Sequence, residues 1–141
     1  MKFHYIYFIL IPVLMIVALL FPFLIYEYED GVIESNNGFD DGLTALFFLT
    51  PTAVATILLF IRNFITAIIG ACIYSLTFCL AVYMNYVIHY QLTFLDDIGP
   101  GPFFILIVTI IATILGIIQG AKLFKNRKLK RNHSDDLLDI D

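Results

Sequence analysis

Four long runs of apolar residues dominate the chain, and short polar segments separate them. The runs cover residues 3–26, 43–61, 64–91 and 102–121. A helix needs about 20 residues to cross the roughly 30 Å hydrocarbon core of a bilayer, so each run is long enough to span a membrane. Helices are expected because lipid cannot satisfy free backbone groups, and no alternation with a period of two is present. The pattern therefore predicts an all-α fold, a polytopic four-transmembrane-helix antiparallel bundle.

Prolines and short polar breaks refine these spans. Pro12 and Pro22 are expected to kink the first span and Pro51 to bend the second span, because each proline removes one backbone donor. Only Arg62 and Asn63 separate the second span from the third, so the chain must reverse direction there. The first span is longer than the apolar core of a cleaved signal peptide, and no small-residue cleavage site follows it. We therefore expect the first span to be an uncleaved signal anchor.

The composition excludes several classes of protein. Hydrophobic residues make up 60% of the chain and charged residues 14%, with a mean hydropathy of +0.90. A soluble domain of this size cannot bury so much apolar surface, and too few charges remain to cover it. A disordered chain and a disulfide-stapled module are excluded on the same grounds. An integral membrane protein remains.

Positive and negative charges occupy different parts of the chain. The basic residues are Lys2, Arg62, Lys122, Lys125, Arg127, Lys128, Lys130 and Arg131. The first and third connections contain no Lys or Arg, and their acidic residues are Glu27, Glu29, Asp30, Glu34, Asp40, Asp41, Asp96 and Asp97. Because cytoplasmic loops carry the excess of Lys and Arg, the N and C termini are predicted to be cytoplasmic. The residue usage is typical of an A+T-rich genome, so we expect a multi-pass protein of a bacterial cytoplasmic membrane.

The two charged ends suggest different contacts. We expect residues 1–124 to form the transmembrane domain and residues 125–141 to form a cytoplasmic tail, first basic and then acidic. Anionic lipid is the expected partner of the basic part, and nucleic acid is not expected. The outer acidic residues are interpreted as solvated loops, with a surface for a cationic partner as the alternative.

Small residues predict which helix faces touch. In lipid, close helix contact depends on small residues and interhelical hydrogen bonds. Ala112, Gly116 and Gly120 form a ladder with a spacing of four on the fourth span, and Gly70 lies among small and polar residues on the third. Thr52 and Thr56 mark a similar face on the second span. We expect these three faces to converge, within one bundle or, alternatively, between copies.

Three polar residues inside the spans are candidate functional groups. Asn85 and His89 lie four residues apart and so share one face near the outer end of the third span. With Asp96 or Asp97 from the next loop, they could form a proton relay or part of a metal site. Two ligands are too few for zinc, so the preferred interpretation is a hydrogen-bonded histidine at the membrane interface. Gln119 is interpreted as a packing residue, and no metal or cofactor is expected.

Function is argued mainly from what the sequence lacks. It contains no nucleophile elbow, phosphate-binding loop, zinc-protease motif or dinucleotide fingerprint. No charged residue lies deep in a span, which disfavours an ion-coupled transporter. The leading hypothesis is a non-catalytic binding or assembly partner of another membrane protein, such as an accessory subunit or an immunity-type protein. The alternatives are an oligomeric channel or small-solute transporter, and an outer-face enzyme that uses His89 with Asp96 or Asp97.

Overall fold

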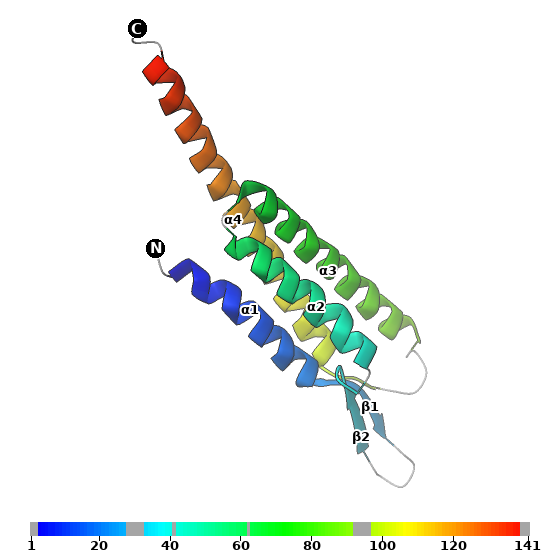
Figure 1. Ribbon diagram of the computed structural model, residues 1–141. Coiled ribbons are helices and arrows are strands. Elements are labelled where there is room, and N and C mark those ends of the chain that lie inside the picture. Colours follow the sequence, from blue (N-terminus) through cyan, green and yellow to red (C-terminus); the bar gives the residue numbers. More distant parts are fainter. Residues whose placement is uncertain (1–2, 28–32, 41, 62, 92–96, 139–141) are drawn as a thin grey trace.

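The protein is a mostly α-helical bundle with a small sheet at one end (Figure 1). The computed structural model describes residues 3–27, 33–40, 42–61, 63–91 and 97–138. The elements in chain order are α1 (Phe3–Leu20), β1 (Pro22–Glu27), β2 (Ile33–Asn37), α2 (Gly42–Phe60), α3 (Phe64–Gln91), β3 (Asp97–Ile98) and α4 (Gly101–Leu138). Successive helices run antiparallel, and each packs against two neighbours in the cyclic order α1, α2, α3, α4.

The prediction of an all-α fold is wrong at the end of the bundle that holds the sheet. The strand order is β2-β1-β3, with both pairs antiparallel. The first span, predicted to cover residues 3–26, ends as a helix at Leu20 and continues as β1. Pro22 explains the change, because a proline has no N–H and disfavours the helical conformation of the residue before it. Pro12, by contrast, lies inside α1 without ending it.

The second and third spans are helical almost to the predicted residues. The helix α2 begins and ends one residue before the predicted limits of 43–61, and it continues through Pro51. The helix α3 covers 64–91 as predicted. Asn63 caps α3, since its side-chain oxygen accepts from the Ile65 backbone N–H at 3.3 Å. The reversal of the chain therefore lies between Phe60 and Phe64.

The helix α4 is longer than the predicted span. It begins at Gly101, one residue before the expected start, but it continues to Leu138 instead of ending at residue 121. Figure 1 shows this C-terminal part extending past the other helices, at the end of the bundle where the N-terminus lies. Good helix formers are frequent after Gly120, and neither Gly nor Pro follows, so no local signal ends the helix.

The outward faces of the helices are apolar. The exposed fraction is 61% for Ile57, 70% for Leu76 and 58% for Ile117. Three helices, covering residues 42–60, 64–90 and 101–128, are long and apolar enough to cross a membrane, and a shorter apolar helix covers Phe8–Leu20. A soluble protein rarely exposes continuous apolar surface on this scale, so these faces indicate contact with lipid.

A chain of hydroxyl groups joins α2 to α3 in the middle of the bundle. The Thr56 hydroxyl donates to the Thr52 carbonyl at 2.7 Å and lies 2.7 Å from the Tyr74 hydroxyl oxygen. Because the single proton of Thr56 is used on Thr52, Tyr74 is the donor to Thr56. Tyr74 is buried, so this hydrogen bond is shielded from both lipid and water.

Small residues bring the backbones of neighbouring helices close together on both sides of these hydrogen-bonded hydroxyl groups. A Cβ atom at Gly70 would lie 3.1 Å from the Ala55 carbonyl oxygen of α2, and one at Gly116 would lie 3.3 Å from the Ala71 Cα of α3. Ala112 is buried one turn earlier on α4. A Cβ atom at Gly120 would meet nothing within 4 Å, so the close approach ends before that position.

Replacing Gly116 should therefore destabilise the bundle much more than the same change at Gly120. We expect Gly116→Leu to lower the free energy of unfolding by about 1–3 kcal/mol, because its side chain must push Ala71 and Tyr74 away. Gly120→Leu should stay within roughly 0.5 kcal/mol. The measurement is thermal or denaturant unfolding in mild detergent. Equal stability of the two variants would contradict the packing described here.

Candidate functional site

The end of the bundle that carries the sheet is closed by one aromatic side chain. Phe23 of β1 is 7% exposed, and its ring lies where side chains at Gly38 and Gly101 would otherwise stand. A Cβ atom at Gly99 would overlap the Pro22 carbonyl, while the Gly99 N–H donates to the Phe23 carbonyl at 2.9 Å. The sheet is therefore packed tightly against the bundle.

The turn from β2 to α2 is held by two side chains that cap each other. Asn37 accepts with its side-chain oxygen from the N–H groups of Phe39 at 2.8 Å and Asp40 at 3.2 Å. In return, a carboxylate oxygen of Asp40 accepts from the Asn37 N–H at 2.6 Å. This reciprocal arrangement resembles a capping box. Asp40 therefore has a structural role in addition to its charge.

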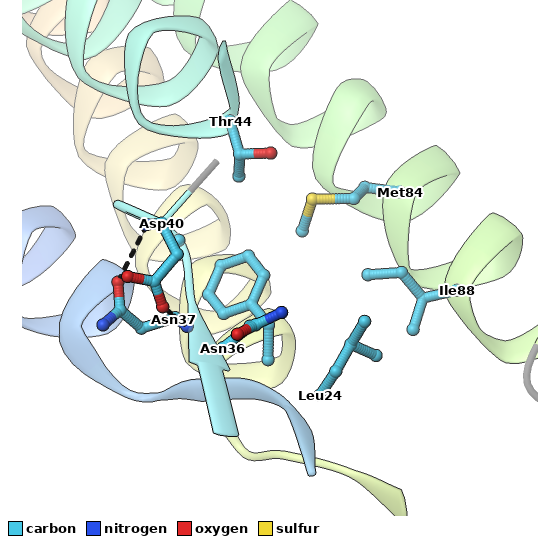
Figure 2. A pocket seen from close by; sticks show the side chains of 9 residues that line it. Leu24, Asn36, Asn37, Asp40, Thr44, Met84 and Ile88 are labelled. Atoms are coloured by element: carbon cyan, nitrogen blue, oxygen red, sulfur yellow. Dashed lines mark hydrogen bonds between the residues drawn. The ribbon is translucent and has the colours of Figure 1, made fainter. Parts of the chain in front are cut away.

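A cavity of about 330 Å³ lies between this turn, the sheet and the helices α2 and α3. We call it the outer cavity, and Figure 2 shows the side chains around it. It is lined by Phe23, Leu24, Asn36, Asn37, Gly38, Asp40, Thr44, Met84 and Ile88. In Figure 2, Met84 and Ile88 lie across the space from the polar residues of the turn. The volume is at the lower end of the range of roughly 300–1,000 Å³ typical of small-molecule sites.

Two of the eight predicted outer acidic residues have described side chains. Glu34 on β2 and Asp40 in the turn are exposed. Glu27 lies in β1 and Asp97 in the neighbouring strand β3, where Asp97 pairs with Ile25, and the side chains of both acidic residues lie outside the described set. The remaining predicted members, Glu29, Asp30, Asp41 and Asp96, fall outside the described residues.

Asn85 joins two helices. Its side-chain nitrogen donates to the Ala81 carbonyl of α3 at 2.9 Å and to the Pro102 carbonyl of α4 at 3.0 Å. Both amide protons are therefore used, one of them between helices. His89, one turn further along α3, is exposed. Asn85 therefore contributes a hydrogen bond to the contact between α3 and α4.

The opposite end of the bundle carries the basic residues. Lys122, Lys125, Arg127 and Lys128 are exposed on α4, and Lys130 and Arg131 lie further along the same helix with side chains outside the described set. Arg127 lies over the Phe64 ring at 5.8 Å, and Phe64 also packs against Phe124 at 5.5 Å. These contacts tie the start of α3 to α4. Gln119, just before them, is half-buried.

The candidate metal ligands are dispersed among the described side chains. Within this part of the chain, no group of three or more His, Cys, Asp or Glu residues is placed to hold a metal ion. No protein-family model, curated protein or solved structure matches the chain. Its function must therefore be inferred from its own residues.

The outer cavity was not predicted from the sequence. Phe23 and Leu24 belong to an apolar run that continues directly from α1, so they were assigned to a membrane span. Pro22, followed by β-prone aromatic and branched residues, was the available signal for a strand. Met84 and Ile88 lie on a helix whose apolar residues are spread around its whole circumference, and this pattern does not distinguish a cavity wall from a lipid-facing surface.

Replacing Asn85 and His89 separately should distinguish a packing role from a chemical one. We expect Asn85→Ala to lower the free energy of unfolding by about 1 kcal/mol, because the Pro102 carbonyl loses its donor on α3. His89→Ala, at an exposed position, should change it by less than roughly 0.5 kcal/mol. Unfolding in detergent measures both values. If Asn85→Ala leaves the free energy of unfolding unchanged, the hydrogen bond between Asn85 and the Pro102 carbonyl does not contribute to stability.

Proposed function

We propose that this small multi-pass membrane protein acts without catalysis, as a binding or assembly partner of another membrane protein. The contact surface in this proposal is the hairpin formed by β1 and β2. Figure 1 shows the hairpin projecting from the bundle at the end opposite the chain termini. A hairpin that reaches beyond the membrane bundle is available to a second protein in a way that the buried helix faces are not.

The edge strand β2 is the observation that carries this proposal. Within the described sheet, β2 pairs with β1 alone and forms one edge. Ile33 at its start is 67% exposed, and Glu34, Ser35 and Asn36 after it are exposed as well. An exposed edge strand accepts an added strand through backbone hydrogen bonds, a common mode of peptide recognition. Ile33 adds an apolar anchor to that surface.

Acidic charge supports a partner with a basic segment. The first connection contains six acidic residues and no Lys or Arg. Such a surface attracts a positively charged partner and repels an acidic one. The attraction weakens with added salt, because exposed charges are screened beyond about 10 Å at 0.1 M.

The proposal includes the topology. We assign α1 as the fourth membrane span, since its 18 residues extend about 27 Å. The N and C termini then lie on the cytoplasmic side of a bacterial cytoplasmic membrane, with the basic part of α4 near anionic headgroups. The sheet and its hairpin lie on the outer side.

The two alternatives have less support. A channel through one bundle conflicts with its packed interior, which includes Phe48, Ile105 and Tyr74 at less than 2% exposure. A channel between copies has no described feature in its favour. An outer-face enzyme would need partners for His89. Of the two proposed partners, Asp96 falls outside the described residues, and Asp97 lies in β3 with its side chain outside the described set.

Cysteine labelling tests the topology. Cys72 and Cys79 would first be replaced by alanine, and one cysteine would then be introduced at Ser35 or at Asn126, both of which are exposed. We expect an impermeant maleimide to label intact cells at position 35 and only lysed cells at position 126. The reverse pattern would overturn the assignment of the termini.

Site-specific photo-crosslinking tests the partner. A photoreactive residue at Ser35 should capture one membrane protein in living cells, and the same residue at Asn126 should not capture that protein. The captured protein should also co-purify with the unmodified chain in mild detergent at near-constant stoichiometry. Capture of only the chain itself, at either position, would contradict the proposal.

Two variants then test whether the captured protein binds at the edge strand β2. Ile33→Ser should reduce co-purification by about fivefold or more, as expected for loss of an apolar anchor worth at least roughly 1 kcal/mol. Glu34→Gln should reduce it more weakly and should make it less sensitive to salt. Asp40→Ala is unsuitable for this test, because it would remove the carboxylate oxygen that accepts from the Asn37 N–H and holds the turn.

A further inference from the structure

Three hollows follow one another along the line where α2 meets α3. The outer cavity is the first. The second, of about 200 Å³, shares Thr44, Met84 and Ile88 with it. The third, of about 350 Å³, shares Phe47 and Leu80 with the second. Because neighbouring hollows share wall residues, the three lie in series along α2 and α3, and we call this series the seam groove.

The seam groove changes from polar to apolar along its length. Asn36 and Asp40 contribute an amide and a carboxylate to its outer end. The innermost hollow is lined by Leu46, Phe47, Thr50, Pro51, Ile73, Leu76, Thr77 and Leu80. The Thr77 hydroxyl is used within α3, where it donates to the Ile73 carbonyl at 2.8 Å. A ligand that fills the whole groove must therefore be polar at one end and apolar over the rest.

The position of the groove fits one leaflet of a bilayer. Ile88 and Ile73 lie fifteen residues apart on α3, which corresponds to about 22 Å along the helix axis. One leaflet accounts for about 15 Å of hydrocarbon, and the headgroup region lies outside it. Tyr86 and Tyr90 are 66% and 73% exposed near the outer end of α3, where an interfacial aromatic belt is expected. The polar end of the groove is thus at headgroup level.

Charge selects the headgroup. One oxygen of the Asp40 carboxylate accepts from the Asn37 N–H, and the carboxylate lies at the cavity wall. The sequence has no Lys or Arg between Lys2 and Arg62, or between Arg62 and Lys122. An anionic headgroup would find no Lys or Arg here, whereas an ammonium group would be attracted to Asp40.

We propose that the seam groove holds one phospholipid with a primary-amine headgroup, of the phosphatidylethanolamine type. Its ammonium group lies at the Asp40 carboxylate, the Asn36 amide donates to its phosphate, and one acyl chain follows the line between α2 and α3. This inference does not depend on the hairpin partner, because the acyl-chain part of the groove lies on the membrane face of the bundle.

The absence of tryptophan from the chain gives a direct test. Phe47→Trp places one fluorophore on the wall of the groove, at a side chain that is 56% exposed. Ile107→Trp is the matched control, since Ile107 is 50% exposed on α4, belongs to none of the three hollows, and lies at a similar distance from the outer end. Each variant is reconstituted in vesicles of phosphatidylethanolamine and phosphatidylglycerol, in which only one of the two lipids carries brominated acyl chains that quench tryptophan.

For Phe47→Trp, we expect quenching to report about threefold enrichment of phosphatidylethanolamine over phosphatidylglycerol, the range typical of a partly exposed ion pair. Ile107→Trp should report no enrichment. Adding Asp40→Asn, which keeps an oxygen for the Asn37 N–H, should reduce the enrichment at Phe47→Trp to none. Equal quenching by both lipids at Phe47→Trp, or enrichment that survives Asp40→Asn, would overturn the proposal. Protection from both lipids would also overturn it, because a protein surface would then occupy the groove.

Discussion

The structure depends on the contact that Tyr74 makes with two neighbouring helices. Its hydroxyl donates to Thr56 of α2, and its ring packs beside Gly116 of α4. Lipid supplies no hydrophobic driving force between helices, so close packing and buried hydrogen bonds must hold them together. One side chain on α3 provides both. The hydroxyl chain continues to the Thr52 carbonyl, so the polar atoms inside this contact are satisfied.

The outer end is organised around a different constraint, the space occupied by Phe23. Glycines at positions 38 and 101 leave room for its ring, and the Gly38 N–H donates to the Leu19 carbonyl at 2.8 Å. The hairpin is therefore joined to the last turn of α1 and to the start of α4. The position of the hairpin places the outer cavity between the sheet and α3. The seam groove begins at this cavity. The proposed protein contact and the proposed lipid site thus share one rigid support.

The sequence predicted the parts of the fold that depend on composition and spacing. The limits of α2 and α3, the reversal at Asn63 and the start of α4 follow from apolar length and from local capping chemistry. The sheet was missed because β1 continues an apolar run, and a short apolar strand has no period that distinguishes it from helix. For the candidate site, spacing placed Asn85 and His89 on one face, but only the fold showed that Asn85 contacts Pro102. The outer cavity is lined by residues from several elements, so no hydrophobic pattern within a single element predicts it.

The length of α4 bears on how the charge of the chain acts at the membrane. From Phe124, which packs against Phe64 at the end of the bundle, the helix continues for fourteen residues to Leu138, or about 21 Å. The Debye length at physiological ionic strength is only about 8 Å. The first basic residues after Phe124 therefore lie within one or two Debye lengths of the lipid headgroups. Asp135 and Asp136 lie near the far end of α4, at more than this distance. A net charge of −4 therefore does not describe this end of the bundle, where the residues of α4 nearest the membrane are basic and the acidic residues lie further along the helix.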